Sequence, residues 1–263
     1  MTDQVDNGAA AFFDLDRTLI AGASTMVFGW VAWRNDLTST REMMSDALRT
    51  VEFRLTGGSD EMTDLVRDRI LEAVEGRNRE DVTALNDEIL PRLLSAVRPE
   101  TRAVVERHHE AGRETYIVSA SPVELVSPLA QALGMTGAIA TESEVVDGRY
   151  TGRLSSEFCY GIGKVNRVRK LADEKGYDLR LCYAYSDSSS DLPLLELVGH
   201  PVAVNPDRTL ARTARERNWP IVVFARRTKA TLTAVSSAAG AAAIGAGMYA
   251  LGRRHGRAIG AVS

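Results

Sequence analysis

The chain has 263 residues, enough for a substantial core in one large domain or two small ones. A net charge of −3, with 25% charged and 44% hydrophobic residues, is ordinary for a globular protein and argues against nucleic acid as the main partner. Cys159 and Cys182 are too few and too far apart for a zinc cluster or a disulfide framework, and residues 1–8 lack the apolar core of a signal peptide. We therefore expect the folded part to lie in the cytoplasm.

The first predicted element is a strand over residues 10–14 that delivers two carboxylates to its end. The apolar run before Asp14 and Asp16 indicates a buried strand, and open α/β sheets keep their chemistry at the carboxyl ends of strands. Two neighbouring carboxylates repel, which favours a hard cation between them, and they can divide the roles of nucleophile and proton donor. Taken alone, Asp-x-Asp is also typical of a solvated strand end.

Residues 22–98 have apolar side chains at helical spacing and no strand pattern. We expect four helices, the last over residues 82–94 and kinked or divided at Pro91. Such an insertion predicts an all-helical cap or lid between two parts of an α/β core. Its aromatic and methionine side chains are expected in the core, while Arg34 and Arg54 are candidates to face a substrate.

Strands alternate with helices from Pro99 onward. The strands are predicted at residues 115–118, 138–141, 181–185, 201–205 and 221–224. An Asp-Gly pair predicts a hairpin over residues 145–150, and the polar helix end at His108 is expected in solvent. Strands separated by helices imply a parallel sheet with helices on both faces.

Further polar groups follow these strands or begin helices: Ser119, Lys164, Asp187 and Asp191. Carboxylates at one sheet edge are suited to hold Mg²⁺, a lysine to neutralise phosphate, and a hydroxyl beside helix-start amides to bind phosphate oxygens. Together with Asp14 and Asp16 they predict a site for phosphoryl transfer.

This arrangement resembles the haloacid dehalogenase (HAD) superfamily, in its phosphoserine phosphatase-like branch. The motifs are Asp14-Leu15-Asp16-Arg17-Thr18, Ile117-Val118-Ser119-Ala120-Ser121, Lys164 and Ser186-Asp187-Ser188-Ser189-Ser190-Asp191. They keep the family's order over residues 9–225. The resemblance implies a Rossmann-like core of residues 9–21 and 99–225 and a helical cap of residues 22–98, and residues 226–263 follow it as a separate tail.

The resemblance also implies the role of each residue. Asp14 would attack phosphorus to give an aspartyl-phosphate, and Asp16 would protonate the leaving oxygen and later activate water. Thr18 and Ser119 would position the phosphoryl group, and Lys164 would offset its charge.

The same resemblance implies a magnesium ion as cofactor. Asp14, Asp187 and the Asp16 carbonyl would bind Mg²⁺, while Asp191 would hold the waters of the ion. The substrate would be a phosphomonoester, hydrolysed in the manner of a phosphatase.

Two positions depart from the pattern of this branch. Ser186 stands where the family usually has glycine, and residues 21–25 contain no acid where phosphoserine phosphatases carry a glutamate that meets the substrate amine. A buried ammonium without a carboxylate partner is costly. The sequence therefore favours a small phosphorylated metabolite other than phosphoserine.

The tail contains an uncharged run, Thr231–Leu251, between basic flanks. Its length suits a membrane span, but its Ala and Gly content makes it weakly apolar. A membrane anchor, an interfacial or self-associating helix and a flexible tail all remain open, and basic flanks favour anionic lipid in the first two.

Other functions fit the same sequence. A membrane-associated phosphatase of a lipid phosphate or lipid precursor would use both site and tail. A binding protein on an inactive HAD scaffold would have lost a nucleophile or metal ligand, and none is missing here. Transfer of the phosphoryl group to an acceptor other than water also stays open.

Overall fold

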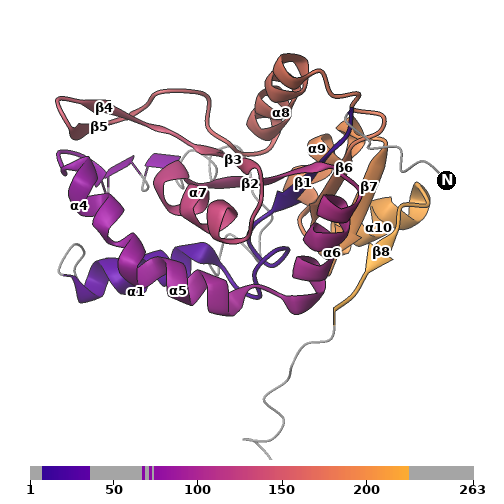
Figure 1. Cartoon of the computed structure of the whole chain (residues 1–263), viewed down its shortest axis with the longest axis horizontal. Helices are drawn as coiled ribbons and strands as arrows, with labels where there is room; N and C mark the ends of the chain where they lie inside the picture. The colour runs from indigo at the N-terminus through magenta and orange to yellow at the C-terminus, as the bar shows by residue number, and fades with distance from the viewer. Residues whose placement is uncertain (1–7, 36–66, 69–70, 73, 225–263) are drawn as a thin grey trace, which may run out of the picture. The chain divides into compact units, whose positions relative to one another are not determined.

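A parallel sheet forms the centre of the molecule in the computed structural model, which describes residues 8–35, 67–68, 71–72 and 74–224. Six strands are ordered β3-β2-β1-β6-β7-β8, and every neighbouring pair is parallel (Figure 1). Their bounds are β1 (Ala10–Asp14), β2 (Glu114–Pro122), β3 (Gly137–Thr141), β6 (Tyr183–Ser186), β7 (His200–Val204) and β8 (Ile221–Val222). The predicted parallel α/β sheet is confirmed.

Strand β1 is the point where the order of strands reverses. The chain adds β2 and β3 on one side of β1, and β6, β7 and β8 on the other. Asp14 pairs with Val118 of β2, and Phe13 pairs with Tyr185 of β6. Because ligands bind at such a reversal, outside the carboxyl ends of the strands, this register brings Ser119 and the residues after Tyr185 beside Asp14.

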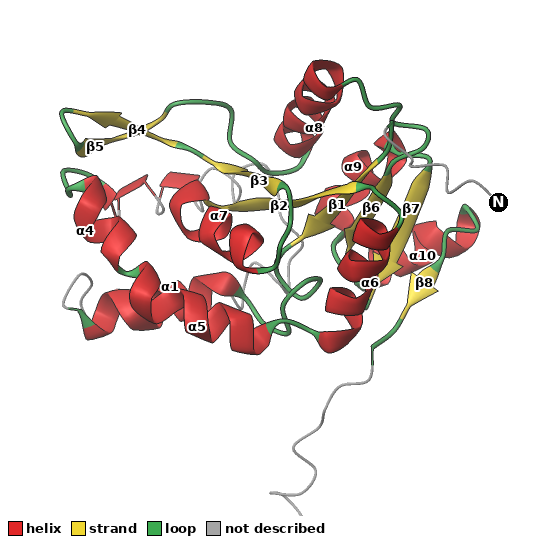
Figure 2. Ribbon diagram, in the orientation of Figure 1, coloured by secondary structure: helices red, strands yellow, loops and turns green. Residues whose placement is uncertain are grey.

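Helices cover both faces of the sheet (Figure 2). Phe13 and Ile117 pack with α6 (Pro99–Glu110) and α7 (Val123–Ala132). Phe12 and Val118 pack on the opposite face with α8 (Ile162–Lys175), α9 (Leu192–Leu197) and α10 (Arg208–Glu216). Successive strand residues point to opposite faces, so a strand buried on both faces reads as the continuous apolar run seen before Asp14.

The described parts of the chain between β1 and α6 contain helices α1 (Ser24–Arg34), α4 (Arg79–Ala84) and α5 (Asn86–Ala96). Of the two alternatives predicted at Pro91, a division of the helix is wrong, because the chain divides at Leu85 and α5 continues through Pro91. Pro91 has no N–H to donate to the carbonyl of Asp87. Both residues are exposed, so water can bond that carbonyl instead. The helices expected within residues 36–66, and Arg54 with them, lie outside the described residues.

The hairpin predicted at the Asp-Gly pair is confirmed. It consists of β4 (Ser143–Val146) and β5 (Arg149–Leu154), with positive φ at Asp147 (49°) and Gly148 (77°). Its second strand also bonds the segment before α4: Gly76 N donates to Tyr150 O (2.9 Å) and Tyr150 N to Arg77 O (3.0 Å). Residues 76 and 77, which lie in the region expected to be helical, therefore form backbone hydrogen bonds with a strand of the hairpin.

His108 is buried, so its predicted exposure to solvent is wrong. Its Nε2 lies 2.8 Å from the hydroxyl of Tyr185, whose ring stacks on Phe13 at 4.5 Å between centroids. Burial, aided by the charge of Arg113, lowers the pKa of His108 to about 4. A neutral imidazole therefore supports the strand residue that precedes Asp14.

No helix within the described ranges is both long and apolar enough to span a membrane. The tail of residues 226–263, including Thr231–Leu251, lies outside those ranges.

Candidate active site

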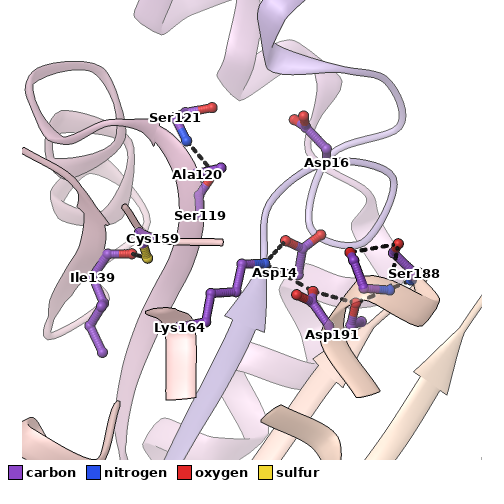
Figure 3. Close-up of polar contacts among 12 residues, drawn as sticks. Asp14, Asp16, Ser119, Ala120, Ser121, Ile139, Cys159, Lys164, Ser188 and Asp191 are labelled. Atoms are coloured by element: carbon purple, nitrogen blue, oxygen red, sulfur yellow. Dashed lines mark hydrogen bonds and ion pairs between the residues drawn. The ribbon is translucent and has the colours of Figure 1, made fainter. Parts of the chain in front are cut away.

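A buried lysine joins two carboxylates at the carboxyl edge of the sheet. Lys164 Nζ donates to Asp14 Oδ1 (2.7 Å) and to Asp191 Oδ2 (2.9 Å), as Figure 3 shows. Burial alone would lower the pKa of Lys164, but the charges of Asp14 and Asp191 raise it by more, and the net shift is upward. The lysine is therefore an ammonium fixed against Asp14.

Two of the carboxylates have strongly raised pKa values. Burial, with a further contribution from Asp191, raises the pKa of Asp14 from 3.8 to about 7 in spite of Lys164. Burial and the charge of Asp14 raise the pKa of Asp187 to about 8 in spite of Arg17. The site thus holds more negative charge than its two cations neutralise.

The turn after β1 positions Asp16 and Thr18. Arg17 has a positive φ of 62°, which turns the chain sharply after the strand. Asp16 Oδ1 accepts a hydrogen bond from Ser24 N (2.7 Å), and the carbonyl of Thr18 accepts one from the Thr101 hydroxyl (3.0 Å). The buried Thr18 Oγ1 has no hydrogen-bond partner among the described residues. It is therefore a hydroxyl able to bond an oxygen of a ligand.

Serine hydroxyls order the loops around the cluster. Ser119 Oγ accepts from Ser121 N (3.2 Å). Ser186 Oγ donates to Asp191 Oδ2 (2.7 Å) and accepts from Ser188 N (3.2 Å). Ser186, at the position usually held by glycine, thus fixes Asp191. The sequence identified this serine only as a departure, because the Asp191 contact crosses a turn that has no periodic pattern.

The predicted site residues lie near one edge of the sheet but are not all in contact. Asp14, Lys164 and Asp191 touch directly, and the charge of Asp187 acts on Asp14. Asp16 lies above this group in Figure 3 and is bonded to Ser24 instead. Arg34, a candidate for substrate contact, lies 4.0 Å from the Glu88 carboxylate and over the Trp30 ring.

The donor atoms at this edge fit a hard cation. Asp187 Oδ2 and Asp191 Oδ1 are buried, and neither has a hydrogen bond from a described residue. Arg17 Nη2 lies 2.5 Å from Asp187 Oδ2 as an ion pair, which shows where that carboxylate attracts positive charge. Among the described residues, no three His, Cys, Asp or Glu side chains already stand at metal-ligand spacing. Carboxylate oxygens are nevertheless the ligands that Mg²⁺ prefers.

The parallel sheet and the lysine–carboxylate group at its edge form an α/β fold whose site is suited to phosphoryl transfer. Residues 11–196 match the model of the haloacid dehalogenase-like hydrolases, and the chain belongs to this family. The family expected from the sequence motifs is confirmed. Phosphatases of this family in general use Mg²⁺.

The similar proteins are named as phosphatases or share the fold. SerB1 of Mycobacterium tuberculosis H37Rv, named a phosphoserine phosphatase, is 38% identical over 95% of this chain and 82% of its own. A protein of Neisseria meningitidis serogroup C, named a histidinol-phosphatase, is 32% identical over 81% of this chain and 98% of its own. A crystal structure of a Bordetella pertussis protein of unknown function has a TM-score of 0.72 at 28% identity, over 81% of this chain and 97% of its own. A phosphoserine phosphatase in apo form, at 17% identity and a TM-score of 0.58, shares the fold over 85% of this chain and 97% of its own.

Proposed function

We propose that this HAD-family phosphatase is a Mg²⁺-dependent hydrolase of a small phosphorylated metabolite and acts through an aspartyl-phosphate. One observation carries the proposal: the carboxylate of Asp14, at the end of the central strand, is fixed 2.7 Å from the ammonium of Lys164. A nucleophile held beside a cation is what phosphoryl transfer needs, since catalysis there rests on positioning and charge neutralisation.

The reaction would proceed in two displacements. A carboxylate oxygen of Asp14 bonds to phosphorus while the ester P–O bond breaks, and Asp16 gives a proton to the leaving alcohol. Water then attacks the phosphorus as Asp16 takes its proton, which frees phosphate and restores Asp14. Thr18 and Ser119 hydroxyls would donate to phosphoryl oxygens, and Lys164 would offset their charge.

Asp14 and Asp187, with the Asp16 carbonyl, would hold Mg²⁺, and Asp191 would bond its waters. The bound ion would supply positive charge to the phosphoryl oxygens. The buried Asp191 Oδ1, which accepts no hydrogen bond from a described residue, supports this assignment, and so does the buried Asp187 Oδ2, which already attracts the charge of Arg17. Residues 9–21 and 99–225 would form the core, and residues 22–98 a cap that selects the substrate.

We expect Mg²⁺ to stabilise the protein more at high pH than at low pH. The pKa of Asp14 is raised from 3.8 to about 7 and that of Asp187 from 3.8 to about 8. Between pH 3.8 and these raised values, the metal-free folded state therefore binds more protons than the unfolded chain does. Its stability therefore falls as pH rises through that window. Mg²⁺ replaces those protons, and its shift in Tm should be larger by about 3 °C or more at about pH 8 than at about pH 5.

This pH dependence is measured by thermal unfolding with and without Mg²⁺ at both pH values. Asp187→Asn should remove most of the difference, while the exposed Asp173→Asn on α8 should keep it. A shift in Tm that is independent of pH would contradict the assignment of these carboxylates to the ion.

Phosphoserine is expected to be a poor substrate. The first turn of α1 has no acid, and the Glu124 carboxylate, which follows β2, already lies 3.7 Å from Arg79. A substrate ammonium buried without a carboxylate should lower kcat/KM by about 10-fold or more relative to an amine-free ester. Phosphate release from phosphoserine, histidinol phosphate, glycerol phosphate and sugar phosphates measures this, and phosphoserine as the best substrate would contradict it.

The same panel tests the function itself. Release that requires Mg²⁺ and is lost in Asp14→Asn supports the proposal, whereas no release from any ester would favour an inactive scaffold. Lipid phosphates in micelles belong in the panel because the uncharged run Thr231–Leu251 has basic flanks. Turnover confined to those lipids would replace the metabolite with a membrane lipid as substrate.

A further inference from the structure

A serine of the first cap helix joins the two sides of the active site. Ser24 is the first residue of α1 and is fully buried. Its backbone N–H donates to Asp16 Oδ1 (2.7 Å), and its hydroxyl lies 2.9 Å from the hydroxyl of Ser121. Asp16 and Ser121 belong to different segments, and both lie above the Asp14–Lys164 pair in Figure 3, Ser121 to the left and Asp16 to the right. Ser24 thus connects the turn after β1 with the end of β2.

The connection continues to the phosphate-binding side of the site. Ser121 is 5% exposed, and its N–H donates to Ser119 Oγ (3.2 Å). An unbroken set of hydrogen bonds therefore runs from the Asp16 carboxylate through Ser24 and Ser121 to the Ser119 hydroxyl. Such a network fixes the distance between a group that handles the leaving alcohol and a group that holds the phosphoryl oxygens.

The start of α1 is held by the two segments that connect the cap with the core. Ala21 N donates to Ala96 O (2.8 Å), and Arg98 N donates to Leu19 O (3.0 Å). Ile20 and Val97 form an antiparallel bridge between these bonds. The segment that leads into α1 (residues 19–21) is thus paired with the segment that follows α5 (residues 96–98). A shift of the cap would move Ser24, and the N–H that orients Asp16 would move with it.

We propose that Ser24 is a positioning residue for Asp16, and that its hydroxyl pair with Ser121 makes the direction of the Asp16 carboxylate depend on α1 lying against β2. The inference rests on the proposed function, in which Asp16 protonates the leaving oxygen. Without the hydroxyl pair, the first turn of α1 has lost its side-chain bond to β2. The Asp16 carboxylate then occupies a wider range of directions, and proton transfer to the alcohol slows.

Leaving-group dependence tests this role. In the proposed mechanism Asp16 acts in both displacements, and the second, the attack of water on the aspartyl-phosphate, is the same for every ester. In the first displacement p-nitrophenolate leaves without a proton, whereas an alkoxide does not, so a defect of Asp16 in that step appears only with alkyl esters. The double variant Ser24→Ala/Ser121→Ala removes both hydroxyls and leaves neither one buried alone, which favours normal folding. Its rate of aspartyl-phosphate formation, measured in a single turnover by rapid quenching, should fall about 10-fold or more on the best alkyl ester and less than about 2-fold on p-nitrophenyl phosphate.

Matched variants separate positioning from general damage. Ser95→Ala removes a cap hydroxyl that bonds Arg92 O at the exposed end of α5 and should leave both rates unchanged. Either single alanine variant should slow the alkyl ester as much as the double variant does, because the two hydroxyls act as one pair. Ser24→Thr keeps the hydroxyl and should restore much of the alkyl-ester rate.

The outcomes distinguish this inference from the function on which it rests. Turnover of p-nitrophenyl phosphate that is lost in Asp14→Asn supports the proposed function. With that turnover in hand, an equal fall in the rate of aspartyl-phosphate formation on both esters, or no fall on either, overturns the role of Ser24 alone. Turnover that persists in Asp14→Asn overturns the proposed function and this role with it.

Discussion

Replacing Asp14 by asparagine is expected to abolish phosphate release while the fold is retained. Asparagine has the same shape but cannot form the acyl-phosphate bond, and loss of a nucleophile typically costs on the order of 10⁴-fold or more in kcat. Stability should not fall, because burial raises the pKa of Asp14 to about 7 and ionisation is therefore already unfavourable. Phosphate release with Mg²⁺ at saturating ester measures the first effect, and thermal unfolding the second.

The control for this variant is Asp173→Asn, which changes an exposed carboxylate on α8. Incorporation of radiolabelled phosphate into the protein adds a direct test. Wild type and the Asp173 variant should carry label after rapid quenching, and the Asp14 variant should carry none. Wild-type activity in the Asp14 variant would show that another group attacks phosphorus.

Patterns within short stretches of sequence predicted the elements that depend mainly on those stretches, such as single strands and hairpin turns. The apolar run before Asp14 defines a strand buried on both faces, and the Asp147-Gly148 pair has the positive φ angles that its hairpin turn requires. The order of motifs was enough to place Lys164 and Asp191 at the same sheet edge as Asp14. Each of these follows from periodicity, turn chemistry or the parallel topology of the sheet.

The features that sequence could not provide depend on contacts between distant segments. Ser24 and Ser121 are 97 positions apart, and no periodic pattern relates them. His108 has a polar local sequence but is buried by packing against Tyr185 of β6. The break at Leu85 was missed because proline is the stronger local signal, although an exposed Pro91 costs the helix little.

The site contains more buried carboxylates than its own cations neutralise. This excess of negative charge destabilises the ionised site and favours the binding of a further cation. Lys164 and Arg17 offset part of the negative charge of the three carboxylates, those of Asp14, Asp187 and Asp191. The charge that is not offset contributes to the raised pKa values of Asp14 and Asp187. A dianionic phosphate ester adds further negative charge. Binding such a ligand therefore requires another cation, which agrees with the proposed Mg²⁺ dependence.

Lys164→Met is expected to lower the free energy of unfolding by about 3 kcal/mol or more at about pH 8 without Mg²⁺, since removing one partner leaves buried carboxylates unpaired. The loss should be smaller at about pH 5, because the pKa of Asp14, already about 7, rises further without the ammonium and the carboxyl then carries a proton. Urea denaturation at both pH values measures this. Lys170→Met on the same helix, whose side chain is 78% exposed, should change stability little at either pH. An equal loss at both pH values would mean that Lys164 acts through packing, whereas a loss confined to high pH would show that its charge is what makes the buried Asp14 carboxylate compatible with this fold.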